Sequence, residues 1–240
     1  MNKLDYISIL AEGKCKFNCP FCIGKDIRKE EKPHIAGDYV DFIQTYGMLT
    51  EEISISGSTS DPYFLSIKIH REIVKESNDL ALRTSLHTRY TKDTKKLREL
   101  LEIYDEVVFG IDENALEDLI GERHIRKYKS KIRFGVVITE DNRRLINRDY
   151  LDAIYLVTGV GSFTFRPDVN SNKYTLGDFI DNMNFEITQV DKVHNSLYFY
   201  YKDKYVSYWD NKVINLNVLY LWGDGKITNN LEWKKLYVTT

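Results

Sequence analysis

The sequence predicts an α/β fold: an open partial (β/α)6 barrel with parallel strands, followed by a small antiparallel β-rich appendage. Two observations predict it. Segments with strand patterns alternate with segments with helix patterns from about residue 4 to residue 168. Beyond about residue 173 this alternation gives way to two hairpin patterns. Strands that alternate with helices are joined by right-handed crossovers and form parallel sheets. We therefore expect a barrel domain over 1–172 and a β-rich cap over 173–240 that packs on it.

The predicted barrel strands are short segments in which apolar residues alternate with polar ones or run together. They are Leu4–Leu10, Glu52–Gly57, Leu80–Ser85, Glu106–Asp112, Lys131–Thr139 and Ser162–Arg166. No residues remain for two further strand-helix units before the pattern changes. The count therefore favours a barrel that stays open rather than a closed one of eight strands.

The helices between these strands are predicted from apolar spacing and from end signals. Tyr39–Tyr46 is followed by Gly47, which is placed to cap it. Asp61-Pro62 combines an N-cap residue with a first-turn proline, so a helix should start there and run through Val74. The other predicted helices are Thr91–Tyr104, Ala115–Lys129 and Tyr150–Val160, the last closed by Gly159 or Gly161.

The C-terminal part of the chain predicts two hairpins, each with a short polar or glycine-containing turn. Their strands are Leu197–Lys202 with Tyr205–Trp209, and Val218–Trp222 with Lys226–Asn229. The first hairpin is rich in aromatic residues, and alternation sends half of them to the core. Packing accounts for most of these rings. The functional alternative is a cap whose outward rings stack on a base or whose edge pairs with a peptide.

Composition places the chain among soluble globular proteins, with 240 residues, 42% hydrophobic and 29% charged. The net charge of -2 gives no strong signal for nucleic acid. The sequence has no long apolar run and no signal-peptide pattern at its start, so we expect a cytoplasmic protein without a membrane partner.

The three cysteines, Cys15, Cys19 and Cys22, all lie within eight residues, in the spacing C-x3-C-x2-C. Thiolates this close can converge on one metal centre, and sulfur ligands favour zinc, copper(I) or an iron-sulfur cluster. Structural zinc and most [4Fe-4S] clusters take four ligands. Three cysteines therefore either borrow a fourth ligand, such as His34, or leave one metal position open. The alternative without a metal is that the three cysteines are unligated thiols.

This spacing, with Phe21 before the last cysteine and a strand before the motif, resembles the radical S-adenosylmethionine (SAM) superfamily. The resemblance implies that the three cysteines hold a [4Fe-4S] cluster, that SAM chelates the remaining iron and that Phe21 packs near its adenine. It also implies reductive cleavage of SAM to a 5'-deoxyadenosyl radical, which abstracts hydrogen from a peptide, nucleotide or small molecule. The reaction class stays open between oxidoreductase, transferase and lyase. Because no cysteine remains for a second cluster, a separate low-potential donor such as flavodoxin should supply electrons.

Ligand contacts in parallel barrels cluster where the strands end. In the superfamily a Gly-Gly-Glu-Pro-like motif after the second strand receives the SAM amino group, and here Gly57 and the later Pro62 match it without the glutamate. The ends of the later strands are also assigned to SAM by the resemblance. The predicted cofactor contacts are Gly57, Ser58, Thr59, Thr84, Ser85, Gly110, Asp112, Asn142 and Arg166. The structural alternatives are turn formation and helix capping for these residues and a surface ion pair for Arg166.

Residues after the third strand, His87, Arg89 and Tyr90, are weak candidates for a substrate pocket, and His70 in a helical pattern is expected to be structural. The stretch Ser60–Tyr63 resembles the branch that includes spore photoproduct lyase, which predicts a nucleic-acid lesion or base as an alternative substrate. The lyase of that branch uses an additional cysteine, which this chain lacks. A hypothesis of another class is a non-catalytic binding module stabilised by zinc.

Overall fold

The computed structural model describes residues 3–17, 19, 32–112, 115–168, 176–184, 189–191, 196–209 and 216–229. The chain forms two compact units, and each is described by itself below. The first comprises Met1–Thr88, Glu99–Val107 and Leu216–Thr240, and the second comprises Arg89–Arg98 and Val108–Asn215. Helix α3 (Lys95–Ile103) and strand β4 (Glu106–Ile111) have residues in both.

The first unit is built on parallel strands. Its strands are β1 (Tyr6–Ala11), β2 (Glu52–Gly57), β3 (Arg83–Thr88), β10 (Val218–Leu221) and β11 (Ile227–Thr228). Strand β1 pairs in parallel with β2 on one side and with β10 on the other, while β11 runs antiparallel to β10. The register sets Ala11 beside Gly57. The loops after β1 and β2 therefore leave the same edge of the sheet.

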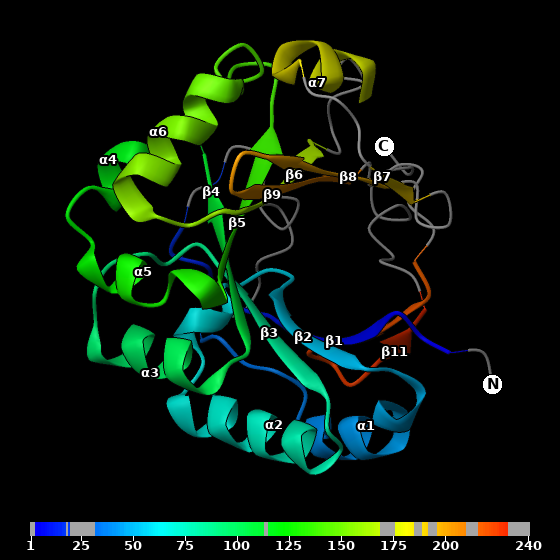
Figure 1. Ribbon diagram of the computed structural model, residues 1–240. Helices are drawn as coiled ribbons and strands as arrows, with labels where there is room; N and C mark the ends of the chain where they lie inside the picture. Colours follow the sequence, from blue (N-terminus) through cyan, green and yellow to red (C-terminus); the bar gives the residue numbers. More distant parts are fainter. Residues whose placement is uncertain are drawn as a thin grey trace, which may run out of the picture. The chain divides into compact units, whose positions relative to one another are not determined.

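Helices α1 (Tyr39–Tyr46) and α2 (Ile67–Asp79) lie side by side along one face of β1, β2 and β3 (Figure 1). Helix α1 buries Phe42 and Ile43, and Ile7, Ile53 and Ile73 in the same core have no exposed surface. Complete burial of each such side chain contributes about 1.5–3 kcal/mol to folding. This core fixes the strand ends that carry the cysteine loop.

Two end signals of these helices act differently from the prediction. Gly47 has a right-handed φ of -59° and continues into the short 3-10 helix η1 (Gly47–Leu49), so it is not a left-handed cap. Its role is close packing, because an added Cβ would lie 2.7 Å from the side chain of Leu80. Asp61 caps the 3-10 turn η2 (Pro62–Phe64), and α2 begins only at Ile67 with Ser66 as its N-cap.

The second unit is also built on parallel strands and ends in an antiparallel hairpin. Its remaining strands are β5 (Ile132–Ile138), β6 (Ser162–Pro167), β9 (Lys204–Trp209), β8 (Ser196–Tyr201) and β7 (Gln189–Asp191). The predicted hairpin is confirmed, since β8 and β9 are antiparallel. Strand β9 also pairs in parallel with β6. The hairpin therefore extends the parallel strands, just as β10 extends them in the first unit.

The helices of the second unit differ from the prediction in two places. They are α4 (Ala115–Leu119), α5 (Arg123–Lys127), the 3-10 turn η3 (Lys129–Lys131), α6 (Arg148–Thr158) and α7 (Leu176–Met183). The single helix predicted over 115–129 is broken at Gly121, whose φ of +84° is left-handed. Helix α7 was not predicted. The predicted cap of α6 is confirmed, because Gly159 has a φ of +71° and ends the helix.

The core of the second unit is a chain of aromatic rings. Phe165 and Phe199 both contact Phe179 of α7, with ring centroids 5.2 and 6.0 Å apart. Lys204 of β9 is 2% exposed, and its Nζ lies 2.8 Å from Asp152 of α6. The ion pair ties the hairpin to the helix and compensates for the buried charge.

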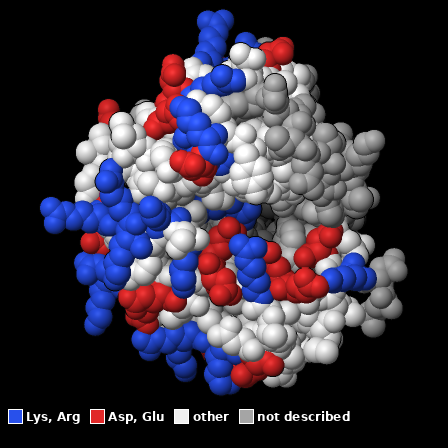
Figure 2. Space-filling model, in the orientation of Figure 1, with Lys and Arg blue, Asp and Glu red and all other residues white. Residues whose placement is uncertain are grey.

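None of the helices in the part of the chain that the structure describes is long and apolar enough to span a bilayer. Figure 2 shows basic side chains gathered over the region of α5. Arg123, Arg126, Lys127 and Lys129 are exposed there. The protein therefore has a local basic patch although its net charge is small.

Candidate functional site

The cysteine loop leaves the carboxyl end of β1 and is closed at its base. The backbone of Glu12 pairs with that of His34 through two hydrogen bonds of 2.9 and 3.0 Å. All three cysteines lie between these two residues in the sequence. Cys15 and Cys19 are half-buried, and the Phe17 N–H donates to Cys15 Sγ at 3.4 Å. Phe21 and Cys22 lie outside the described residues.

Glycines allow this base to form. Gly13 has a φ of +112°, and a Cβ there would lie 2.5 Å from the carbonyl oxygen of Lys32. Gly223, in the turn between β10 and β11, sits against the other side: its Cβ would lie 2.7 Å from Glu12 and 2.9 Å from His34. At Gly13 only glycine fits without displacing the backbone, whereas at Gly223 the side chains of Glu12 and His34 would have to move. His34, the predicted alternative fourth metal ligand, therefore lies at the base of the cysteine loop.

Side chains from the first turn after β2 hold the cysteine loop from the neighbouring strand. The Gly13 N–H donates to Thr59 Oγ1 at 2.9 Å. The ring of Phe17 contacts that of Phe64 with centroids 5.8 Å apart, and Lys16 Nζ lies 5.1 Å from the centre of the same Phe64 ring. The loop is thus seated on β2 and η2.

The turn Gly57–Asp61 folds back onto the end of β1. The N–H groups of Ser58 and Ser60 both donate to the carbonyl oxygen of Ala11, at 2.9 and 3.3 Å. A Cβ on Gly57 would lie 2.4 Å from the Ser60 carbonyl oxygen, so the turn requires glycine. Of the predicted SAM contacts here, the Thr59 hydroxyl thus accepts a bond from the cysteine loop and the Ser58 N–H serves the turn.

Asp61 joins this turn to the end of β3. Asp61 is 7% exposed, and its carboxylate accepts hydrogen bonds from the Tyr63 N–H at 2.9 Å and from the Thr88 hydroxyl at 2.6 Å. These hydrogen bonds give Asp61 of the Asp-Pro-Tyr stretch a structural role that needs no bound substrate. His70 is structural as predicted: it is fully buried, and its ring nitrogens lie 2.8 Å from Tyr104 Oη and 3.1 Å from the Pro62 carbonyl oxygen.

The predicted bounds of the third strand, Leu80–Ser85, were wrong, because β3 begins at Arg83 and runs to Thr88. Arg83 is its first residue, and Thr84 pairs with Ile53 near the start of β2. Thr84 and Ser85 are fully buried at the amino end of the strand. The Thr84 hydroxyl donates to Asp105 at 2.9 Å, and that of Ser85 donates to Glu52 at 3.1 Å. These bonds occupy the hydroxyls that the sequence assigned to SAM, and the carboxyl end of β3 carries His87 and Thr88 instead.

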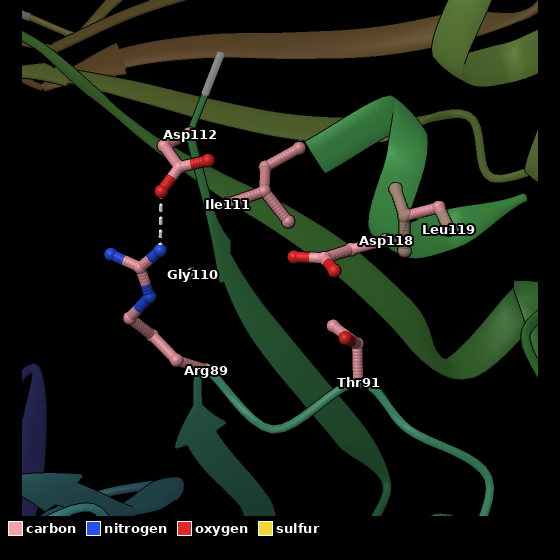
Figure 3. A pocket seen from close by; sticks show the side chains of 7 residues that line it. All are labelled: Arg89, Thr91, Gly110, Ile111, Asp112, Asp118 and Leu119. Atoms are coloured by element: carbon pink, nitrogen blue, oxygen red, sulfur yellow. Dashed lines mark hydrogen bonds and ion pairs between the residues drawn. The ribbon is translucent and has the colours of Figure 1, made fainter. Parts of the chain in front are cut away.

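In the second unit the structure joins two residues that the sequence had assigned to different roles. Arg89, a substrate-pocket candidate, forms an ion pair of 2.5 Å with Asp112, a predicted SAM contact (Figure 3). Their side chains are 23% and 20% exposed, so the pair is partly shielded from water. The Tyr150 hydroxyl donates to the Asp112 carbonyl oxygen at 3.0 Å. Their positions after the consecutive strands β3 and β4 predict that the two residues lie near each other, but not that their side chains pair.

A small pocket surrounds the Arg89–Asp112 ion pair. Figure 3 shows the charged pair on one side and the side chains of Thr91 and Asp118 on the other. The lining residues are Arg89, Thr91, Gly110, Ile111, Asp112, Asp118 and Leu119. Gly110 and Asp112 therefore lie, as predicted, at the carboxyl end of β4 and beside a cavity. Thr91 and Asp118 are lining residues that the sequence did not single out.

The last two predicted contacts differ in accessibility. Asn142 is fully buried, its side-chain oxygen accepts the Thr139 N–H at 2.8 Å and its amide donates to the Val137 carbonyl oxygen at 2.9 Å. It therefore shapes the loop after β5. Arg166 is exposed at the end of β6.

Comparison with known proteins defines the fold. The chain matches no known family model and no curated protein. Among solved structures it resembles SuiB of Streptococcus suis, including forms bound to S-adenosylmethionine and to the precursor peptide SuiA. The TM-scores of these two forms are 0.60 and 0.62 at 12% identity, over the whole of this chain. The chain shares the fold of the part of SuiB that it matches.

The predicted fold class, a mixed α/β fold with mainly parallel strands, is thereby confirmed. A second similar structure is anSMEcpe with bound AdoMet and the Kp18Cys peptide, with a TM-score of 0.53 and 14% identity over 74% of this chain and 59% of that one. The chain spans about three fifths of the length of the SuiB chains, 60% and 61% of the two bound forms.

Proposed function

We propose that this protein is a radical SAM enzyme, which cleaves SAM reductively at a [4Fe-4S] cluster held by Cys15, Cys19 and Cys22. The observation that carries the proposal is the position of the cysteine motif. It follows β1 directly and is seated on the Gly57 turn of β2, in a fold shared with structures that contain bound SAM. Sequence spacing and fold therefore support the same chemistry independently.

The residues fit the proposed cluster in donor chemistry. Thiolates are the ligands that iron-sulfur clusters take. Cys15 and Cys19 are half-buried in a loop closed by the Glu12–His34 bridge. Among the described residues no three His, Cys, Asp or Glu side chains are grouped to hold a metal, and Cys22, the third proposed ligand, lies outside them. By the family resemblance, three cysteines leave one iron for SAM.

When bound, the cluster would supply the electron that splits the sulfonium of SAM to a 5'-deoxyadenosyl radical. The protein's own contribution is to bind and orient SAM and to exclude water. In the first unit, we assign the backbone of Gly57–Thr59 to the SAM amino group and Phe21 to its adenine. In the second unit, Gly110 and Asp112 are proposed contacts, with Arg89 fixing the orientation of the Asp112 carboxylate.

The proposed substrate is a peptide, a nucleotide or a small molecule that donates a hydrogen atom to the radical. Two of the similar structures contain a bound peptide, which supports the peptide class. A flavodoxin-like protein or another low-potential donor is the proposed source of electrons. We also propose a cytoplasmic location, where such donors occur.

The experiment that tests the proposal is SAM cleavage by protein purified and reconstituted without oxygen. With a strong reductant, the wild-type protein should convert SAM to 5'-deoxyadenosine. Cys19→Ala should abolish the product, because it removes one of the three proposed ligands. Asp79→Ala changes an exposed residue at the end of α2 and should leave the rate unchanged. Undiminished cleavage by Cys19→Ala would contradict the site assignment.

A further inference from the structure

Two large apolar side chains are exposed on the helices of the second unit. Leu156 of α6 is 77% exposed, and Ile120, in the turn after α4, is 65% exposed. Helices α4 and α6 pack against each other. On the core-facing side of α6, Leu151 and Ile154 have no exposed surface. The core of the unit therefore accounts for neither exposed side chain.

Arg126 joins helix α5 to the end of α6 that carries Leu156. Its guanidinium donates hydrogen bonds to the carbonyl oxygens of Leu156 and Val157, both at 2.7 Å. A cation is favourable there, because the last carbonyl groups of a helix carry partial negative charge. Arg123 precedes Arg126 by three positions on α5, and residues with this spacing share one face of a helix. A second arginine therefore lies on the face of α5 that carries Arg126.

Lys129 adds a third cation at the end of α6. A Cβ on Gly159 would lie 3.3 Å from Lys129 Cδ, so the lysine side chain passes beside the glycine that ends this helix. Figure 2 shows the basic side chains gathered over α5. We call the exposed side chains of this region the α5–α6 surface; they are Ile120, Arg123, Arg126, Lys129 and Leu156.

Within the described ranges of the chain, no carboxylate forms an ion pair with the three cations of this surface. Other exposed cations of the unit do have such partners: Lys92 Nζ lies 3.2 Å from Asp118. Glu122, next to α5, is engaged elsewhere, because its Oε2 accepts the Asp93 N–H at 3.1 Å and lies 3.3 Å from His124 Nδ1. The α5–α6 surface therefore keeps a local positive charge.

We propose that the α5–α6 surface docks an acidic segment of a partner protein. Its apolar side chains would cover Leu156 and Ile120, and its carboxylates would pair with Arg123 and Lys129. Protein interfaces are enriched in arginine and bury apolar side chains at their centre, and complementary charge orients the partners. A nucleic-acid backbone would meet the cations but leave the apolar side chains in water. Membrane binding needs a broader apolar face than two side chains offer.

The docked segment would not enter the proposed SAM site. Leu156 lies near the end of α6 that leads into the amino end of β6, whereas Gly110 and Asp112 lie at the carboxyl end of β4. The proposal therefore goes beyond the proposed function and does not depend on it.

Equilibrium binding tests the proposal, with a fluorescent peptide in which single leucines are separated by pairs of glutamates. The peptide should bind saturably at low salt and more weakly at physiological ionic strength, because salt screens exposed charges. Polyglutamate of the same length should bind about tenfold more weakly, because it lacks the apolar side chains. Absence of peptide binding at millimolar concentration, or equally tight binding of polyglutamate, would overturn the proposal.

Variants locate the binding on the α5–α6 surface. Leu156→Ser and Arg123→Glu should each weaken peptide binding about tenfold and keep the wild-type urea midpoint, because both side chains are exposed. The matched controls are Met48→Ser, at a side chain that is 76% exposed, and Lys68→Glu, at an exposed position of α2. Both controls should bind the peptide as the wild type does. Unchanged binding by both Leu156→Ser and Arg123→Glu would place the peptide elsewhere and contradict the proposal.

Polyuridylate and vesicles that contain phosphatidylglycerol test the other classes of partner. Both are anionic, so weak binding that disappears at physiological ionic strength is expected from charge alone and would support the positive charge of the surface. Binding of either one that persists at this ionic strength and is lost in Arg123→Glu, without binding of the peptide, would assign the surface to nucleic acid or to a membrane and overturn the proposal.

Discussion

At the scale of single residues, the Asp61 carboxylate joins the turn after β2 to the end of β3. Asp61→Ala would leave the buried Tyr63 N–H and Thr88 hydroxyl without their acceptor. We expect the free energy of unfolding to fall by about 1–3 kcal/mol, measured by urea denaturation. Asp79→Ala, whose side chain is 64% exposed, should change it by less than about 0.5 kcal/mol. Equal effects of the two variants would contradict this role of Asp61.

Thr84 provides a second test at this scale, since the structure moves it from the predicted SAM site to the amino end of β3. Its hydroxyl donates to Asp105 Oδ2 at 2.9 Å and accepts the Asp105 N–H at 3.2 Å. Thr84→Val should lower the free energy of unfolding by about 1–3 kcal/mol. SAM affinity, measured by equilibrium dialysis, should stay unchanged. A stable variant with weakened SAM binding would restore the original assignment.

The Asp152 carboxylate makes the stability of the second unit depend on pH. Hydrogen bonds from Lys202 and Lys204 lower its pKa from the usual 3.8 to about 2. Because the folded-state pKa is the lower one, the ion pairs stabilise the fold above about pH 4, and this contribution is lost as the pH falls towards 2. The difference in urea midpoint between wild type and Asp152→Asn should therefore shrink over that range. A constant difference from pH 7 to pH 2 would contradict this account.

At the scale of elements, the base of the cysteine loop depends on Gly13. An alanine there would have an unfavourable φ of +112° and a Cβ 2.5 Å from the Lys32 carbonyl oxygen. We expect Gly13→Ala to distort the loop and to reduce the iron bound after reconstitution by at least half. Gly37→Ala is the matched control, because no atom lies within 4 Å of the added Cβ. Full iron content in Gly13→Ala would show that the loop tolerates the change.

The same scale shows what the sequence could predict. Local patterns were sufficient for Glu52–Gly57 and Tyr39–Tyr46, whose predicted and observed bounds coincide. They failed at Leu80, which ends α2 and packs under Gly47 but was counted as the start of a strand. Short-range patterns also cannot show that β9 pairs with β6, since that contact joins distant segments. The predicted cofactor contacts Thr84 and Ser85 were placed at the wrong end of β3 because the prediction started this strand at Leu80.

At the scale of the whole molecule, the order of strands and helices was enough to predict the fold class, because crossover handedness leaves few arrangements. The site was predicted in part. The cysteine motif and Gly57 meet at one sheet edge, while Asn142 is occupied by its own loop. Pairing between side chains, such as Arg89 with Asp112, required the structure because no local rule specifies it.

The most direct test of the central claim is the metal content of wild-type protein purified without oxygen. We expect a brown protein with about four irons per chain, the content of one [4Fe-4S] cluster. The iron should disappear in Cys19→Ala. A colourless protein with one zinc per chain would contradict the claim and would favour a zinc-stabilised binding module.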